Sequence, residues 1–213
     1  MQTAESTFPD FYADAPPITL RDPLAEFLGA ACGGLMTYRY VDAVRLAGHS
    51  CPTVAGAWLM TVQGLRALYG DETPVRGEIE VFMQGGREDG ANGVVATVVQ
   101  LITGAAPETG FHGIGGRFSR HNLLQFDQPV QGSFGLRRVD TGRAVQVALD
   151  AQVVPWPDEM RALLPRAAAG RASADELERF GQLWQARVRQ MLVEHATDPR
   201  LVQVREWHSE HVA

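Results

Sequence analysis

The sequence contains no lysine: all 19 of its lysine-plus-arginine positions are arginine. Without lysine, the chain has no residue for a Schiff base, for a pyridoxal-phosphate linkage or for the phosphate-binding lysine of a P-loop. The formal net charge is −6 and the pI is about 5.5. No basic patch stands out from the sequence, so nucleic acid is not expected as a partner.

Cysteine and long apolar runs are also scarce. Only Cys32 and Cys51 are present, too few for a disulfide framework, so we expect free thiols in a reducing compartment. No apolar run approaches the roughly 20 residues of a membrane helix. Residues 1–17 are acidic and rich in proline, and they lack the basic and apolar segments of a signal peptide. These absences predict a cytoplasmic protein without a membrane partner.

The composition is that of a globular protein, with 45% apolar and 21% charged residues in 213. The chain divides into an N-terminal arm (1–22), a region of mixed helices and strands (23–155) and a helical C-terminal extension (156–213). We expect an α+β fold in which a central antiparallel or mixed sheet is covered by a buried helix. An amphipathic C-terminal helix follows.

Period-two alternation and turn residues predict five strands. They are expected at 36–46, 75–83, 117–126, 132–140 and 143–154. A short helix is expected after Asp22 and Pro23, which have the chemistry of an N-cap and a first helical position. Residues 54–69 predict the central helix, because small side chains interrupt its apolar run. Residues 94–103 fit either a strand or a short buried helix.

The C-terminal extension carries a capping box, Ser173 with Glu176. Apolar residues then recur at spacings of three and four up to about His195. They are Leu177, Phe180, Trp184, Val188 and Met191. This stripe predicts a helix that packs along its whole length.

The densest chemical motif is His49-Ser50-Cys51-Pro52, at a predicted junction with the central helix. Proline fits the first helical turn, which places Cys51 at the N-cap, where the helix dipole favours a thiolate. His49 is close enough to present its imidazole on the same side. A thiolate with an imidazole suits either a divalent metal, zinc first, or a nucleophile with its base. A buried cysteine beside a structural histidine is the third reading.

The stretch from Gly48 to Thr53, followed by Gly56, resembles the Gly-His-x-Cys-Pro-Gly-x-x-x-Gly opening of the FmdE domain family, named after a component of formylmethanofuran dehydrogenase. Residues 100–104 (QLITG) resemble the end of a helix in that family, which favours a helix for 94–103. The resemblance covers roughly residues 23–155 and implies a homodimer.

Three features depart from the family pattern. Val94 and Thr97 stand where the family usually has cysteine and aspartate. A longer loop containing His112 and Arg117 replaces a Gly-Lys-Gly-like segment, and the C-terminal zinc ribbon of some members is absent. The resemblance therefore implies a related domain with a rebuilt site.

A zinc ion on His49 and Cys51 needs further ligands, and His112 and His121 are the candidates. Two arginines are candidates for binding an anion. Arg117, with Arg120 nearby, could bind a carboxylate or phosphate bidentately, and Arg87 lies in a glycine-rich loop whose amides could cradle an anion. An ordinary loop or a solvated strand face explains them equally well.

Three functions remain open from the sequence. The first is a metal-binding, FmdE-like protein that acts on or senses a small molecule, or assists a redox or one-carbon enzyme. The second is a metal-free enzyme with Cys51 as nucleophile and His49 as base. The third is a binding protein that keeps only the fold.

Overall fold

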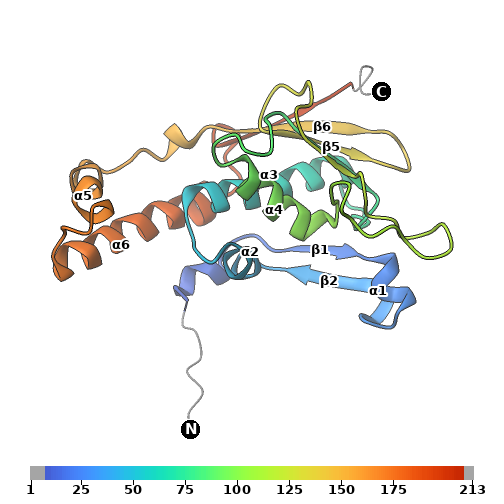
Figure 1. The fold of residues 1–213 in the computed structure, drawn as a ribbon, viewed down its shortest axis with the longest axis horizontal. Helices are drawn as coiled ribbons and strands as arrows, with labels where there is room; N and C mark the ends of the chain where they lie inside the picture. Colours follow the sequence, from blue (N-terminus) through green and yellow to red (C-terminus); the bar gives the residue numbers. More distant parts are fainter. Residues whose placement is uncertain (1–7, 209–213) are drawn as a thin grey trace, which may run out of the picture.

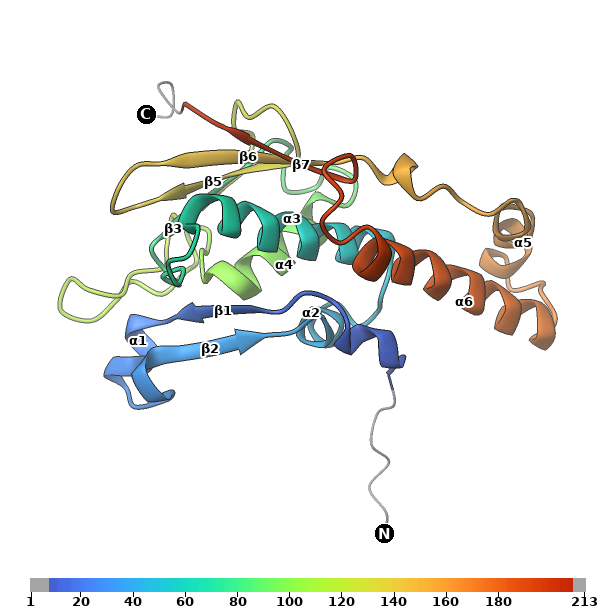
Figure 2. The same cartoon turned by 180° about the vertical axis from the view of Figure 1, so that it is seen from behind.

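The computed structural model describes residues 8–208, which form three layers (Figures 1 and 2). A five-stranded sheet lies on one side, helices α3 and α4 form the middle layer, and a two-stranded hairpin with α2 lies on the other side. This arrangement confirms the predicted α+β class with a helix packed across a sheet.

The large sheet is mixed, with strand order β4-β3-β5-β6-β7. The strand bounds are Ile79–Met83 (β3), Leu124–Gln125 (β4), Phe134–Arg138 (β5), Ala144–Leu149 (β6) and Val202–Glu206 (β7). The β3–β4 pair is parallel and the other three pairs are antiparallel. The expected strand at 117–126 shrinks to β4, because tight turns occupy the residues before it.

The central helix, α3 (Pro52–Tyr69), confirms the prediction for 54–69. It packs between the sheet and α4 (Asn92–Thr103), which settles residues 94–103 as a helix. Small residues in α3 face the sheet: a Cβ on Gly64 would lie 2.8 Å from a methyl group of Leu136 and 3.1 Å from one of Val147. Trp58 in the same helix is fully buried.

The prediction for 36–46 is wrong over most of its length. Strand β2 covers only Leu35–Tyr38, and Tyr40–Ala47 is helix α2. The buried residues Tyr40, Ala43 and Val44 follow helical spacing, whereas the period-two pattern shared only some of them. Gly48 ends α2 in the left-handed conformation.

Parts of the expected arm also belong to the folded core. Residues 1–7 lie outside the described residues, but Asp10–Ala13 form a 3₁₀ turn (η1) and Ile18–Arg21 form β1, which pairs antiparallel with β2. Asp22 caps the short helix α1 (Pro23–Phe27) as predicted, and Cys32–Gly34 (η2) leads into β2.

The C-terminal extension contains more than the predicted helix. After the turn Ala151–Val153 (η3), α5 (Asp158–Ala168) and α6 (Ala174–Arg189) form a helical hairpin that projects from the body in both views. A π-helical turn (η4, Gln190–Glu194) continues α6, and the chain then returns as β7 to the edge of the large sheet.

The capping box of α6 is confirmed, but the burial of its whole stripe is not. Val188 and Met191 are buried, whereas Leu177 is 48% exposed and Trp184 is only partly buried. The difference follows from the projection of the helix, because only its C-terminal part reaches the core.

Candidate functional site

The motif His49–Pro52 lies at the start of α3. Cys51 is the N-cap, as predicted: its Sγ accepts from the Val54 amide at 3.5 Å, and its side chain is buried. His49 is exposed, and its Nδ1 lies 2.9 Å from the carbonyl oxygen of Ala47. Helix α6 covers this motif, since Trp184 donates its indole N–H to the carbonyl of Ser50 at 3.1 Å.

His112 and His121 meet each other at the opposite end of α3. Their ring centroids are 4.3 Å apart. The residue before His121, Arg120, binds Asp22 together with Arg76, which lies shortly after the C-terminal end of α3. Because α3 spans 18 residues, or about 27 Å, these histidines are far from His49 and Cys51.

The four expected zinc ligands therefore do not converge on one point. Among residues 8–208, no group of three or more histidine, cysteine, aspartate or glutamate side chains is arranged to hold a metal ion. The donors at His49 and Cys51 lack a third partner, so the residues do not fit a zinc site of the expected kind. No helix in the same range is long and apolar enough to cross a membrane.

A different set of charged residues is gathered beside this second end of α3. Asp22 is 3% exposed and forms ion pairs with Arg76 at 2.9 Å and with Arg120 at 2.7 Å. We call Asp22, Arg76 and Arg120 the arginine cluster. Two guanidinium groups share one carboxylate here, so the cluster keeps one positive charge in excess.

The backbone positions each member of the arginine cluster. Asp22 accepts from the Leu24 and Ala25 amides as the N-cap of α1. Arg76 follows a parallel bridge between Arg21 and Val75, and its own amide donates to Arg21. Arg120 donates its amide to Phe111 and accepts from Ala106, which ties the 104–123 loop to the cluster.

Two glycines make room for the Arg120 guanidinium. A Cβ on Gly77 would lie 2.5 Å from Arg120 Cζ, and a Cβ on Gly104 would collide with Arg120 Nη1. Gly104 also ends α4 in the left-handed conformation, with φ +71°. These two positions require glycine for the arginine to be seated as observed.

The arginine cluster has unused hydrogen-bond donors. Arg120 is 7% exposed, and its buried Nη1 has no acceptor; the buried Nε of Arg76 has none either. A buried donor without a partner costs about 1–3 kcal/mol. Such groups call for an explanation, and a ligand with acceptor oxygens supplies one.

Two cavities share residues of the arginine cluster. The first, which we call the arginine cavity, has a volume of about 370 Å³, and Arg76 and Arg120 line it together with Arg117, Glu78 and Ser119. The second is larger, about 760 Å³, and is mostly apolar. Its lining includes Leu28, Met36, Phe111 and Ile114.

The electrostatics keep Asp22 ionised. Burial by itself raises the pKa of this carboxyl, but the hydrogen bonds from Arg76 and the Ala25 amide and the charges of Arg120 and Arg76 outweigh it. The net effect is a pKa below the ordinary value. The carboxylate therefore stays charged at neutral pH and holds both guanidinium groups in place.

The two arginines proposed from the sequence have different surroundings. Arg117 is exposed at the arginine cavity, with its guanidinium 4.5 Å from the centre of the Phe118 ring. Arg87 instead pairs with Glu108 at 2.5 Å and lines neither of the two cavities. The structure thus brings Arg117, and not Arg87, to the arginine cluster.

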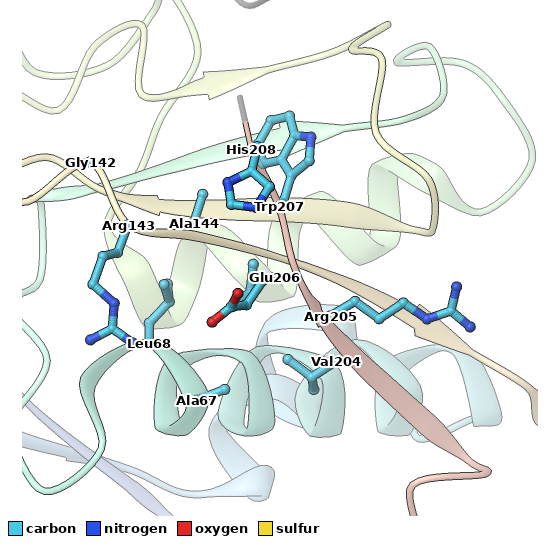
Figure 3. A pocket seen from close by; sticks show the side chains of 11 residues that line it. Ala67, Leu68, Gly142, Arg143, Ala144, Val204, Arg205, Glu206, Trp207 and His208 are labelled. Carbon is cyan, nitrogen blue, oxygen red and sulfur yellow. The ribbon is translucent and has the colours of Figure 1, made fainter. Parts of the chain in front are cut away.

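A third cavity, of about 570 Å³, lies between the C-terminal part of α3 and strands β6 and β7 (Figure 3). Its charged side chains do not converge, because Arg205 points away from Arg143 and Glu206. None of the residues proposed from the sequence lines it.

The sequence pattern does not reveal Asp22 and Arg76 as site residues. It marks Asp22 only as a helix cap, and this residue lies 54 positions from Arg76 and 98 from Arg120. No local spacing signals such a cluster. The nearby pair Ser119 and His121 does offer a signal, because the two residues are separated by one position.

No protein-family model and no curated protein matches the chain. Among solved structures, one similar chain is an FmdE-like protein of tungsten formylmethanofuran dehydrogenase from Syntrophus aciditrophicus. Its TM-score is 0.43 and its identity 17%, over 80% of this chain and 72% of that chain. The neighbour bears the family description that the 48–56 motif resembles. At this level of likeness, the chain's own residues have to carry any statement about function.

Proposed function

We propose that this protein binds a small anion, a carboxylate or phosphate compound, in the arginine cavity. The observation that carries the proposal is the buried Nη1 of Arg120, a guanidinium donor without an acceptor on a residue that lines this cavity. An oxygen of a bound anion is the acceptor that this group lacks.

The charges of the cavity support an anionic ligand. Arg76, Arg117 and Arg120 line it, against Glu78 on the wall and Asp22 behind the guanidinium groups. Arginine also suits this task by its shape, because its planar fork matches the oxygens of a carboxylate or a phosphate.

The size of the cavity limits the ligand. A volume of about 370 Å³ is at the small end of the range for ligand sites, which is about 300–1,000 Å³. Phe118, Leu123 and Val139 supply apolar contacts for the rest of the molecule. We therefore expect a small anion with an apolar part.

Arg117 is the residue to test, because it is exposed and its loss leaves the buried ion pairs intact. We expect calorimetry at low ionic strength to show binding of inorganic phosphate or succinate to the wild type. Arg117→Gln should weaken that binding about tenfold, which corresponds to the 1.4 kcal/mol of a charge-assisted hydrogen bond.

Arg143→Gln is the matched control, since Arg143 is an exposed arginine beside the third cavity. Its binding should stay within about twofold of the wild type, as expected for a distant surface change. Equal losses in both variants would reduce the effect to general charge attraction. Absence of binding at millimolar phosphate and succinate would refute the proposal.

A further inference from the structure

A serine and a histidine are hydrogen-bonded beside the arginine cavity. The Oγ of Ser119 lies 2.6 Å from Nδ1 of His121. Ser119 lines the cavity, and both residues are half-buried. In the tautomer that carries its proton on Nε2, the imidazole accepts the hydroxyl proton through Nδ1, which is the relation of a nucleophile to its base.

We propose that Ser119 and His121 are catalytic residues, nucleophile and base, for hydrolysis of small esters that carry an anionic group. The choice of an anionic substrate rests on the anion binding proposed above. The nucleophile itself does not, because the Ser119–His121 contact is independent of any ligand.

The position of His121 is fixed on several sides. Its ring lies against that of His112 with an interplanar angle of 33°. Its amide donates to Phe111, and the next amide, of Asn122, donates to Pro107. A base held in this way keeps its nitrogen on the serine hydroxyl, as general-base catalysis requires.

The backbone around this pair is strained. Phe118 precedes Ser119 with φ +64°, and Asn122 follows His121 with φ +59°. Side chains other than glycine rarely adopt these values, and they are least favourable for a bulky residue such as phenylalanine. The Phe118 ring is packed between Phe27, at 5.2 Å, and the Arg117 guanidinium. Strain retained by surrounding contacts is typical of functional sites.

The reaction balances with water as the second substrate. Ser119 Oγ forms a bond to the ester carbonyl carbon while its proton moves to His121 Nδ1. The tetrahedral intermediate expels the alcohol oxygen, which takes that proton. A water molecule then attacks the acyl-serine, passing its proton through the same nitrogen to Oγ, and the acid is released.

The geometry assigns the anionic group of the substrate to the arginines. Arg117 and Arg120 line the same cavity as Ser119, so a carboxylate on the guanidinium groups leaves the ester near Oγ. Binding of this kind converts recognition of the charged end into orientation of the reacting end.

Reaction with a neutral fluorophosphonate probe tests the nucleophile, with the modified residue located by mass spectrometry. We expect the wild type to be labelled on Ser119, and labelling to be lost in Ser119→Ala and slowed at least tenfold in His121→Gln. Ser133→Ala is the control and should label like the wild type. Circular dichroism of each variant verifies that it is folded.

The rates with 4-nitrophenyl acetate and 4-nitrophenyl hemisuccinate test the substrate class. We expect kcat/KM to be at least tenfold higher for the anionic ester, and Arg117→Gln to remove that preference by lowering the hemisuccinate rate more than the acetate rate. Labelled Ser119 without this preference would overturn the anionic substrate and keep the nucleophile. An unlabelled Ser119, with hydrolysis equal in Ser119→Ala, would overturn the nucleophile even where phosphate still binds.

Discussion

At the scale of single residues, Asp22 has the most demanding environment of the described carboxylates near the proposed site. It is a helix cap and the shared partner of two arginines, and it is almost fully buried. Removing its charge leaves two guanidinium groups without their counter-charge in a poorly solvated place. Breaking a buried ion pair on one side typically costs about 3–5 kcal/mol.

We therefore expect Asp22→Asn to lower the free energy of unfolding at pH 7 by roughly 3–5 kcal/mol, measured by urea denaturation. The folded pKa of Asp22 lies below its unfolded value, so its contribution is present above about pH 4 and is lost as the pH falls further. The gap between wild type and variant should close in acid. Asp71→Asn, at an exposed aspartate, should change stability by less than about 0.5 kcal/mol at either pH.

At the scale of elements, α3 depends on its first residues for more than chemistry. Proline at the first position and Cys51 at the N-cap begin the helix, and α6 covers that end through Trp184. Serine is a better N-cap than cysteine and accepts from the same amide. The local role of Cys51 is thus structural in the observed contacts, although a metal site was the sequence prediction.

For α3 we expect Cys51→Ser to fold with unchanged helix content and a free energy of unfolding within about 1 kcal/mol of the wild type. Metal analysis of the purified wild type, Cys51→Ser and the exposed-thiol control Cys32→Ser should give the same zinc content, because the expected ligands do not meet. Stoichiometric zinc in the wild type that disappears only in Cys51→Ser would reinstate the zinc site.

At the scale of the whole molecule, the projecting α5–α6 hairpin leaves apolar side chains without a complete cover. Leu177 is exposed, and Phe180 and Trp184 are half-buried and stack on each other at 5.5 Å. The homodimer expected from the sequence stays a prediction, and this hairpin is the surface that a second copy would use. Isologous contact of such a face is the commonest route to a dimer.

Light scattering at micromolar concentration should then give twice the chain mass of 23.2 kDa. Leu177→Glu should shift the mass toward a single chain, because it places a charge in an apolar contact. The control Glu178→Gln, on the neighbouring exposed position, should keep the wild-type mass. A single-chain mass for the wild type would contradict the dimer.

The sequence by itself determined the elements whose signals are local. The cap at Asp22, the start of α3 at Cys51 and Pro52, and the capping box of α6 were all predictable, since each depends on residues within one helical turn. The candidate Arg117 could also be named from the chain. Helix α2 was mistaken for a strand because short apolar patterns fit both periods.

Only the tertiary structure decided which of these residues meet. It separated His49 and Cys51 from His112 and His121 by the length of α3, and it brought Asp22, Arg76 and Arg120 together from three distant segments. It also returned the C-terminal segment to the sheet as β7. The physical reason is that helix caps and turns are set by neighbouring residues, whereas burial and ion pairing depend on contacts between parts of the chain that sequence spacing does not relate.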